Sequence, residues 1–274
     1  MTDSWWLKFK RAQQHMVDIR REARRYANAH PYRLVPIRQP KRYDNIRRYK
    51  VEITEQPDPI IAIMLGDFIH NLRSALDHVV VAATSPHSKR KNAAFPVSTE
   101  NLWEKDAQRR YIIRDAARRK SFLRAIDGLP DEAQTIVIRA QPYQLPDRAQ
   151  ENILALLSRL ENADKHRELI TIGPGVRWPM IVPTAFDGTV MQPPIHFLGP
   201  NEFARDGTEI TFTIPPTNPE VEMKFSGTAT VSIKIVHGGR NEPASEFNLC
   251  PTMATALRNA RFLLREMETY VVRG

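Results

Sequence analysis

Apolar residues recur at alternating steps of four and three near both ends of this 274-residue chain. Such spacing places one apolar stripe along a helix and is typical of helices that pack on other helices. In residues 3–27 the stripe comprises Trp5, Phe9, Ala12, Met16, Ile19, Ala23 and Tyr26. In residues 251–271 it comprises Met253, Leu257, Ala260, Leu264, Met267 and Val271. We therefore predict a long helix at each end, and we expect the last to return to a helical lobe, most simply against the first.

Two further long helices are predicted at 58–83 and 149–169. The first would begin with Asp58 as its N-cap and Pro59 at the first helical position. Shorter helices are expected at 100–107, 110–126 and 131–140. Two short strands, 32–38 and 45–54, are expected to be joined by a basic turn, with Pro36 keeping the first at a sheet edge.

The stretch "GPGVRWP", residues 173–179, has two glycines and two prolines and should stop any helix. The segments after it are rich in β-branched residues, so we predict a small antiparallel sheet over 180–236, with a possible hairpin turn at Ser226–Gly227. The fold class is therefore α+β. Its predicted parts are a basic helical lobe at 1–172 with a short N-terminal β-hairpin, a β subdomain at 173–250, and a C-terminal helix at 251–274.

The net charge of +9 is unevenly distributed. Residues 1–50 hold fourteen lysines and arginines against four acids, whereas residues 171–250 hold five against eight. This asymmetry favours RNA or another polyanion as partner of the basic half. The residues expected to contact nucleic acid are Arg20, Arg21, Arg24, Arg25, Arg47 and Arg48. The alternative is that these arginines serve backbone groups and helix ends.

Cysteine usage and hydropathy suggest the compartment. Cys250 is the single cysteine, so an intrachain disulfide is excluded and a cysteine-based zinc site is not expected. The N-terminal residues lack the apolar core of a signal peptide, and no apolar run reaches the roughly 18 residues of a membrane span. We therefore expect a cytoplasmic protein without membrane association.

The densest polar cluster is "GDFIHNLRSALDH", residues 66–78. On a helix, one side would be apolar, and the other would carry Asp67, His70, Asn71, Arg73, Ser74, Asp77 and His78. Arg73 and Asp77 have the spacing of an ion pair. His70 and His78 would be separated by about 12 Å, so they cannot share one metal ion, and we expect no metal and no cofactor. A serine in the middle of a helix lacks nearby oxyanion donors, which argues against Ser74 as a nucleophile.

Arg73 and His78 fit the R-x4-H pattern, and the segment resembles the motif of HEPN-type ribonucleases. That resemblance implies a dimer in which arginine and histidine from two protomers cleave RNA without metal. His78 would activate the ribose hydroxyl and Arg73 would stabilise the phosphorane-like charge, with His70 and Asp77 completing the catalytic set. Ser74 departs from the family pattern. Residues five apart on a helix are also about 140° apart, so convergence would need a partner or a helix break.

A second polar stretch, "NADKHREL" at 162–169, ends the predicted third long helix. Asp164 continues the line of Ile153, Leu157 and Leu160, so polar groups enter the core-facing side. We expect Asp164 to pair with His70 or His78, and His166 with Asp77. Such a network is either structural or a tuned acid–base site.

Taken together, these segments resemble a widespread family of bacterial and phage-borne proteins. Members have an H-N-L-R-S-A-L-D-H-like helix, F-P-[IV] and Q-P-Y turns and a closing N-x-D-K-H-R, and the resemblance covers about 58–172. It implies an architecture and a site rather than a reaction. The implied site residues are His70, Asn71, Arg73, Asp77, His78, Asp164, His166 and Arg167.

Three hypotheses follow from this cluster. The first is a metal-independent, HEPN-like endoribonuclease that acts as a homodimer. The second is a non-enzymatic nucleic-acid-binding or protein-interaction protein in which the cluster is a structural network. The third is a metal-dependent hydrolase, with one histidine joined by ligands from another helix.

Overall fold

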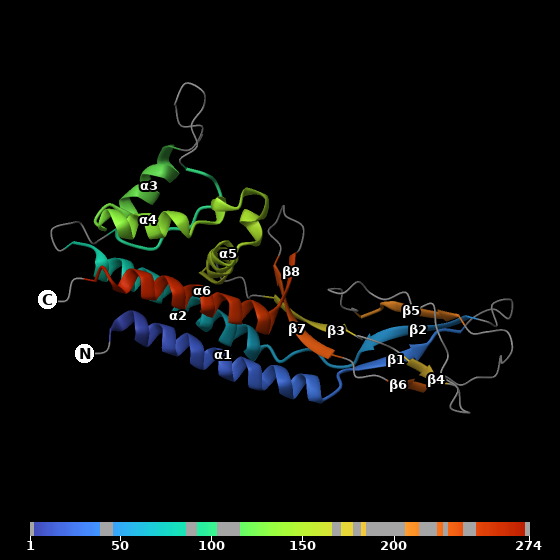
Figure 1. The fold of residues 1–274 in the computed structure, drawn as a ribbon. Coiled ribbons are helices and arrows are strands. Elements are labelled where there is room, and N and C mark those ends of the chain that lie inside the picture. Colours follow the sequence, from blue (N-terminus) through green and yellow to red (C-terminus); the bar gives the residue numbers. More distant parts are fainter. Residues whose placement is uncertain are drawn as a thin grey trace, which may run out of the picture. The chain divides into compact units, whose positions relative to one another are not determined.

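The computed structural model describes residues 3–38, 46–85, 92–102, 116–165, 171–177, 182–184, 206–213, 224–226, 230–237 and 245–271. Its fold is mainly helical α+β, as predicted (Figure 1). The chain divides into two compact units. The helical unit comprises Met1–Ile19, Ala62–Ile170 and Cys250–Gly274, and the β unit comprises Arg20–Ile61 and Thr171–Leu249.

The long helices form where the sequence predicts them. They are α1 (Ser4–Asn28), α2 (Ile60–Ala83), α5 (Ile153–Lys165) and α6 (Leu249–Glu268). Helix α5 begins later than expected because Pro146–Glu151 forms the 3₁₀ turn η4, and Asn152 then caps the helix by accepting the N–H of Leu154 at 2.8 Å. Asp58 caps α2 in the same way by accepting the N–H of Ile60 at 2.9 Å, which confirms the predicted N-cap.

The core of the helical unit is built from the apolar stripes of its helices. In α1, the stripe residues Trp5, Phe9, Ala12, Met16 and Ile19 are all buried. In α2, the apolar side of the helix is buried from Leu65 to Ala83. Helices α1 and α2 are antiparallel neighbours, since Ser4 at the start of α1 contacts His78 near the end of α2. Figure 1 shows α6 running in the same direction as α2 and opposite to α1.

Two shorter helices, α3 (Ala116–Ile126) and α4 (Asp131–Arg139), complete the helical unit with the 3₁₀ turn η3 (Pro142–Gln144). Their positions agree with the C-terminal part of the predicted 110–126 helix and with the predicted 131–140 helix. The predicted helix at 100–107 is not observed in its described residues, because 100–102 form a bend and a turn. Its remaining residues, like 110–115, lie outside the described part of the chain.

The N-terminal hairpin belongs to the β unit, which corrects the predicted helical lobe of 1–172. Strands β1 (Tyr32–Pro36) and β2 (Ile46–Ile53) are antiparallel, and β2 also pairs with β5 (Glu209–Thr213). The strand order is β1-β2-β5, so Pro36 does lie on an edge strand. The open edge of the hairpin is completed by a strand about 160 residues later in the chain.

The described residues of "GPGVRWP" contain no helix, as predicted, but the strands begin before residue 180, where the predicted sheet begins. Strand β3 (Thr171–Arg177) includes its first five residues and pairs with β7 (Thr230–His237), with Pro174 opposite Ile233. The order of this sheet is β3-β7-β8, where β8 is Ser245–Asn248. Proline is tolerated in β3 because an edge strand leaves one side of its backbone unpaired.

The remaining strands, β4 (Val182–Thr184) and β6 (Lys224–Ser226), pair with each other. The described β6 and β7 therefore belong to different sheets, and the predicted hairpin across Ser226–Gly227 is wrong. Among the described residues, no helix is both long and apolar enough to cross a membrane.

Candidate functional site

Arg73 lies at the centre of the predicted site and is buried, with 8% of its surface exposed. Its Nε donates to Oε2 of Glu161 on α5 at 3.3 Å, and its Nη2 donates to the carbonyl oxygen of Phe95 at 3.0 Å. The two ionic side chains are almost equally buried. Removing a charge from such a pair leaves the other buried and uncompensated, so the pair ties α2 to α5.

Asp77, one helical turn after Arg73, also binds the backbone of Phe95. Its Oδ1 accepts the N–H of Phe95 at 2.9 Å. The i,i+4 spacing that predicts an Arg73–Asp77 ion pair instead places both side chains on the backbone of Phe95. The predicted ion pair between Arg73 and Asp77 is therefore wrong. The side chain of Phe95 is only 1% exposed, so its backbone N–H and C=O groups need hydrogen-bond partners within the protein, and Asp77 and Arg73 provide them.

Gln141 fixes the residues that follow Phe95. This side chain is only 1% exposed, and its Oε1 accepts the N–H of Ser98 at 2.8 Å. Its Nε2 donates to the carbonyl oxygens of Pro96 and Val137, both at 2.9 Å. We call residues 94–98 the Phe95 strap. Arg73 and Asp77 of α2 and Gln141, two residues after α4, hold it through four of its backbone groups.

The other predicted residues of α2 have separate environments. The Nδ1 of His78 is 3.1 Å from the Oγ of Ser4. His70 is exposed, and Ser74 is half-buried. Asn71 donates from its side chain to the carbonyl oxygen of Asp67 at 2.8 Å, a contact within the helix. No described contact joins Arg73 to His78.

The predicted contribution of the second polar stretch falls largely outside the described residues. Asp164 belongs to α5, but its side chain is not described, and neither are His166 and Arg167. Three residues of the observed network were not predicted, namely Phe95, Gln141 and Glu161. Glu161 had a signal, since it stands seven residues after the buried Leu154 and therefore on the same face of α5.

A cavity of about 640 Å³ lies beside the strap. Its described lining includes Arg73 of α2, Asn92, Ser98, Thr99 and Glu100, and Arg118, Ser121 and Arg124 of α3. The Nη1 of Arg73 is buried and has no hydrogen-bond partner among the described residues. A second cavity, of about 570 Å³, shares Asn92, Arg124 and Ala125 with the first. We call the larger one the Phe95 cavity.

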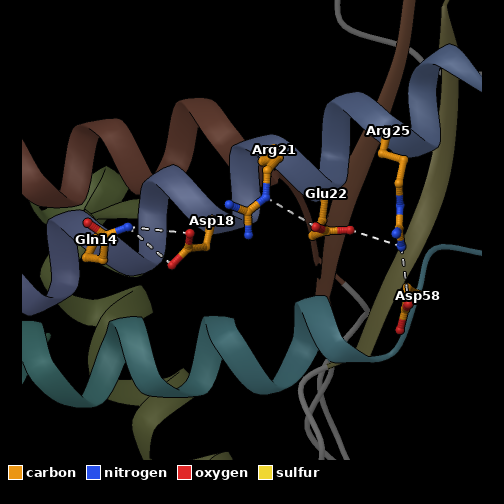
Figure 2. A network of polar contacts seen from close by, with 6 residues as sticks. All are labelled: Gln14, Asp18, Arg21, Glu22, Arg25 and Asp58. Carbon is orange, nitrogen blue, oxygen red and sulfur yellow. Dashed lines mark hydrogen bonds and ion pairs between the residues drawn. The ribbon is translucent and has the colours of Figure 1, made fainter.

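The predicted nucleic-acid contacts on α1 are exposed. Arg20, Arg21, Arg24 and Arg25 all face solvent, and we call these four side chains the α1 arginine face. Figure 2 shows Glu22 between Arg21 and Arg25, with nitrogen–oxygen distances of 3.5 and 3.0 Å, and Asp58 at 3.5 Å from Arg25. Arg20 and Arg24 form no ion pair with any described residue.

Strand β2 carries the other two predicted nucleic-acid contacts, Arg47 and Arg48. Arg48 pairs with Glu209 on the neighbouring strand β5. Arg47 is part of β2, and its side chain is not described. Arg48 is therefore already neutralised in part, so the α1 arginine face is the better exposed group of cations.

No described set of three or more His, Cys, Asp or Glu side chains is arranged to hold a metal ion. Comparisons with protein families, with curated proteins and with solved structures found no match to this chain.

Proposed function

We propose that this protein binds RNA or a related polyanion through the α1 arginine face, and that the polar cluster of α2 has a structural role. The observation that carries the proposal is that Arg20 and Arg24, one helical turn apart, are exposed and form no ion pair with any described residue. Two neighbouring guanidinium groups without acidic partners provide donors and positive charge for successive phosphates.

The position of these arginines strengthens the argument. Residues 20–61 hold eleven lysines and arginines against five acids, whereas residues 171–249 of the same unit hold five against eight. Glu22 and Asp58 offset the charges of Arg21 and Arg25. We therefore assign the main phosphate contact to Arg20 and Arg24 and a weaker one to the other pair. A cytoplasmic location and a homodimer belong to the same proposal and rest on the sequence.

The decisive experiment is a binding titration with fluorescently labelled single-stranded RNA. Arg20→Glu/Arg24→Glu should weaken binding at least tenfold. The matched control is Arg261→Glu/Arg265→Glu, which changes the net charge equally at two exposed, i,i+4-spaced arginines of α6. Absence of RNA binding by the wild type, or an equal loss in both variants, would contradict the proposed surface.

The metal-free ribonuclease predicted from R-x4-H stays a prediction, and the same preparation tests it. Incubation of wild type with RNA in EDTA should leave the RNA intact if α2 is structural. Cleavage that disappears in His78→Ala would instead favour the HEPN-like mechanism. Asp77→Asn adds a further distinction, because an amide oxygen can still accept the N–H of Phe95 but cannot act as a carboxylate base.

A further inference from the structure

We infer that the Phe95 cavity is a binding site for a small phosphate-bearing ligand of nucleotide size. This site lies in the helical unit and is independent of the α1 arginine face. The inference begins with the guanidinium of Arg73, which uses Nε for Glu161 and Nη2 for the carbonyl of Phe95. Its third nitrogen, Nη1, is buried without a described acceptor, and Arg73 is part of the cavity lining.

A buried guanidinium donor requires an acceptor oxygen, because a buried donor without a partner destabilises the fold. The contacts at Nε and Nη2 fix the plane of the guanidinium, so the direction of Nη1 is also fixed. An oxyanion that enters the cavity as far as Nη1 would gain a charge-assisted hydrogen bond without having to order a mobile side chain.

The rest of the described lining is rich in donors. It contains three arginines but one acid, Glu100, which pairs with Arg118 at 3.0 Å. Arg73 is balanced by Glu161, whereas Arg124 is exposed and forms no ion pair with any described residue. The charge left without a described counterion is therefore that of Arg124. Hydroxyl groups of Thr99 and Ser121 and the amide of Asn92 add neutral donors, whereas the Ser98 hydroxyl already donates to the carbonyl oxygen of Glu100 at 2.8 Å.

These donors come from three parts of the chain: α2, residues 92–102 and α3. A phosphate group suits such an arrangement better than a carboxylate, because its oxygens can accept bonds from several directions at once. The volume of about 640 Å³ is within the usual range for small organic ligands, roughly 300–1,000 Å³. The aromatic residues Phe95 and Phe122 supply apolar wall for the organic part of the ligand.

Isothermal titration of the full chain with three probes tests the site. The probes are adenosine 5′-monophosphate, inorganic phosphate and adenosine. We expect saturable binding of the monophosphate, at least tenfold weaker binding of phosphate and none of adenosine. If phosphate binds as tightly as the monophosphate, or adenosine as tightly as either, the assigned ligand class is wrong.

Arg124→Ala is the informative variant, because this exposed side chain lines the cavity and its removal should not impair folding. It should raise the dissociation constant of adenosine 5′-monophosphate at least tenfold. The control, Arg139→Ala, removes an exposed arginine at the end of α4 that is not part of the described lining. Equal effects of the two variants, or no saturable binding by the wild type, would overturn the inference.

Discussion

Arg73 was predicted to be a catalytic cation, and its contacts with Glu161 and Phe95 indicate that it also stabilises the fold. Arg73→Met should lower the free energy of unfolding by about 3–5 kcal/mol, because Glu161 would remain buried without its counterion. Glu161→Leu should cost a similar amount for the converse reason. The double variant should recover part of this loss, since it removes both charges together. Urea denaturation of the three variants measures the effect.

The control for this series is Arg139→Met, which removes an exposed arginine of the helical unit and should change stability by less than about 0.5 kcal/mol. If Arg73→Met proves as mild as this control, Arg73 is not engaged with Glu161 in solution. A double variant that loses the sum of both single losses would likewise argue against a direct ion pair.

His15 gives the helical unit a dependence on pH. This residue of α1 is buried, with 7% of its surface exposed. Burial is the main cause that lowers its pKa below 6.5, and the positive charge of Arg11 is the second. The negative charges of Asp67 and Asp18 raise the pKa by smaller amounts. Protonation is therefore less favourable in the folded than in the unfolded chain. The stability associated with neutral His15 is present above pH 6.5 and is lost as the pH falls below it.

The measurement is the thermal midpoint as a function of pH. Wild type should lose stability progressively below pH 6.5, and His15→Gln should show a shallower decline because glutamine does not titrate. His70→Gln removes an exposed histidine of α2 and serves as the control. A decline that is unchanged in His15→Gln would show that carboxylates or other groups are responsible.

At the residue scale, the sequence identified the polar cluster but not its partners. Helical spacing placed Arg73 and Asp77 on the same face of α2, and this was sufficient to predict that they act together. It could not indicate that both would bind the backbone of Phe95, because peptide groups in a loop leave no trace in side-chain patterns. Glu161 was detectable, since it follows the buried face of α5, but the prediction took Asp164 as the first inward polar residue of that helix.

At the element scale, the Phe95 strap depends on Gln141. Gln141→Leu preserves the approximate size of the side chain but removes its bonds to Ser98, Pro96 and Val137. The loss should be about 2–4 kcal/mol, because the N–H of Ser98 and the carbonyl of Pro96 lose their partner in a partly buried position. The free energy of unfolding in urea is the measurement. Gln144→Leu, which affects one exposed bond to the carbonyl of Ile138, should cost less than 1 kcal/mol.

The elements themselves differ in how predictable they are. The stripes of α1 and α2 repeat over several turns, and burial follows them closely. Such local periodicity results from the helix geometry alone. Strand pairing joins segments far apart in the sequence. The first five residues of "GPGVRWP" belong to β3 because they pair with β7, more than 50 residues later in the chain. The pairing of β2 with β5 was missed for the same reason.

At the scale of the whole molecule, each unit is assembled from separated segments. The chain passes between the units at 19–20, 61–62, 170–171 and 249–250. Cutting the chain at any one position therefore cannot separate the two units from each other. The experiments above require the full chain. Helices α1, α2 and α6 each have residues in both units.

The net charge of +9 makes salt dependence the most direct test of polyanion binding at this scale. Each phosphate contact on a single strand contributes about −0.7 to the slope of the logarithm of the binding constant against the logarithm of salt concentration. If the four residues of the α1 arginine face each neutralise one phosphate, the slope should be about −3.

Arg20→Glu/Arg24→Glu should reduce the magnitude of that slope by at least about 1.4, because two of the phosphate contacts are lost. Arg261→Glu/Arg265→Glu alters the net charge equally and should leave the slope within about 0.5 of wild type, because the proposal assigns no phosphate contact to these two residues. RNA titrations over a series of salt concentrations measure all three slopes. Equal slopes for the two variants would mean that RNA responds to the total charge of the molecule and not to a localised face on α1.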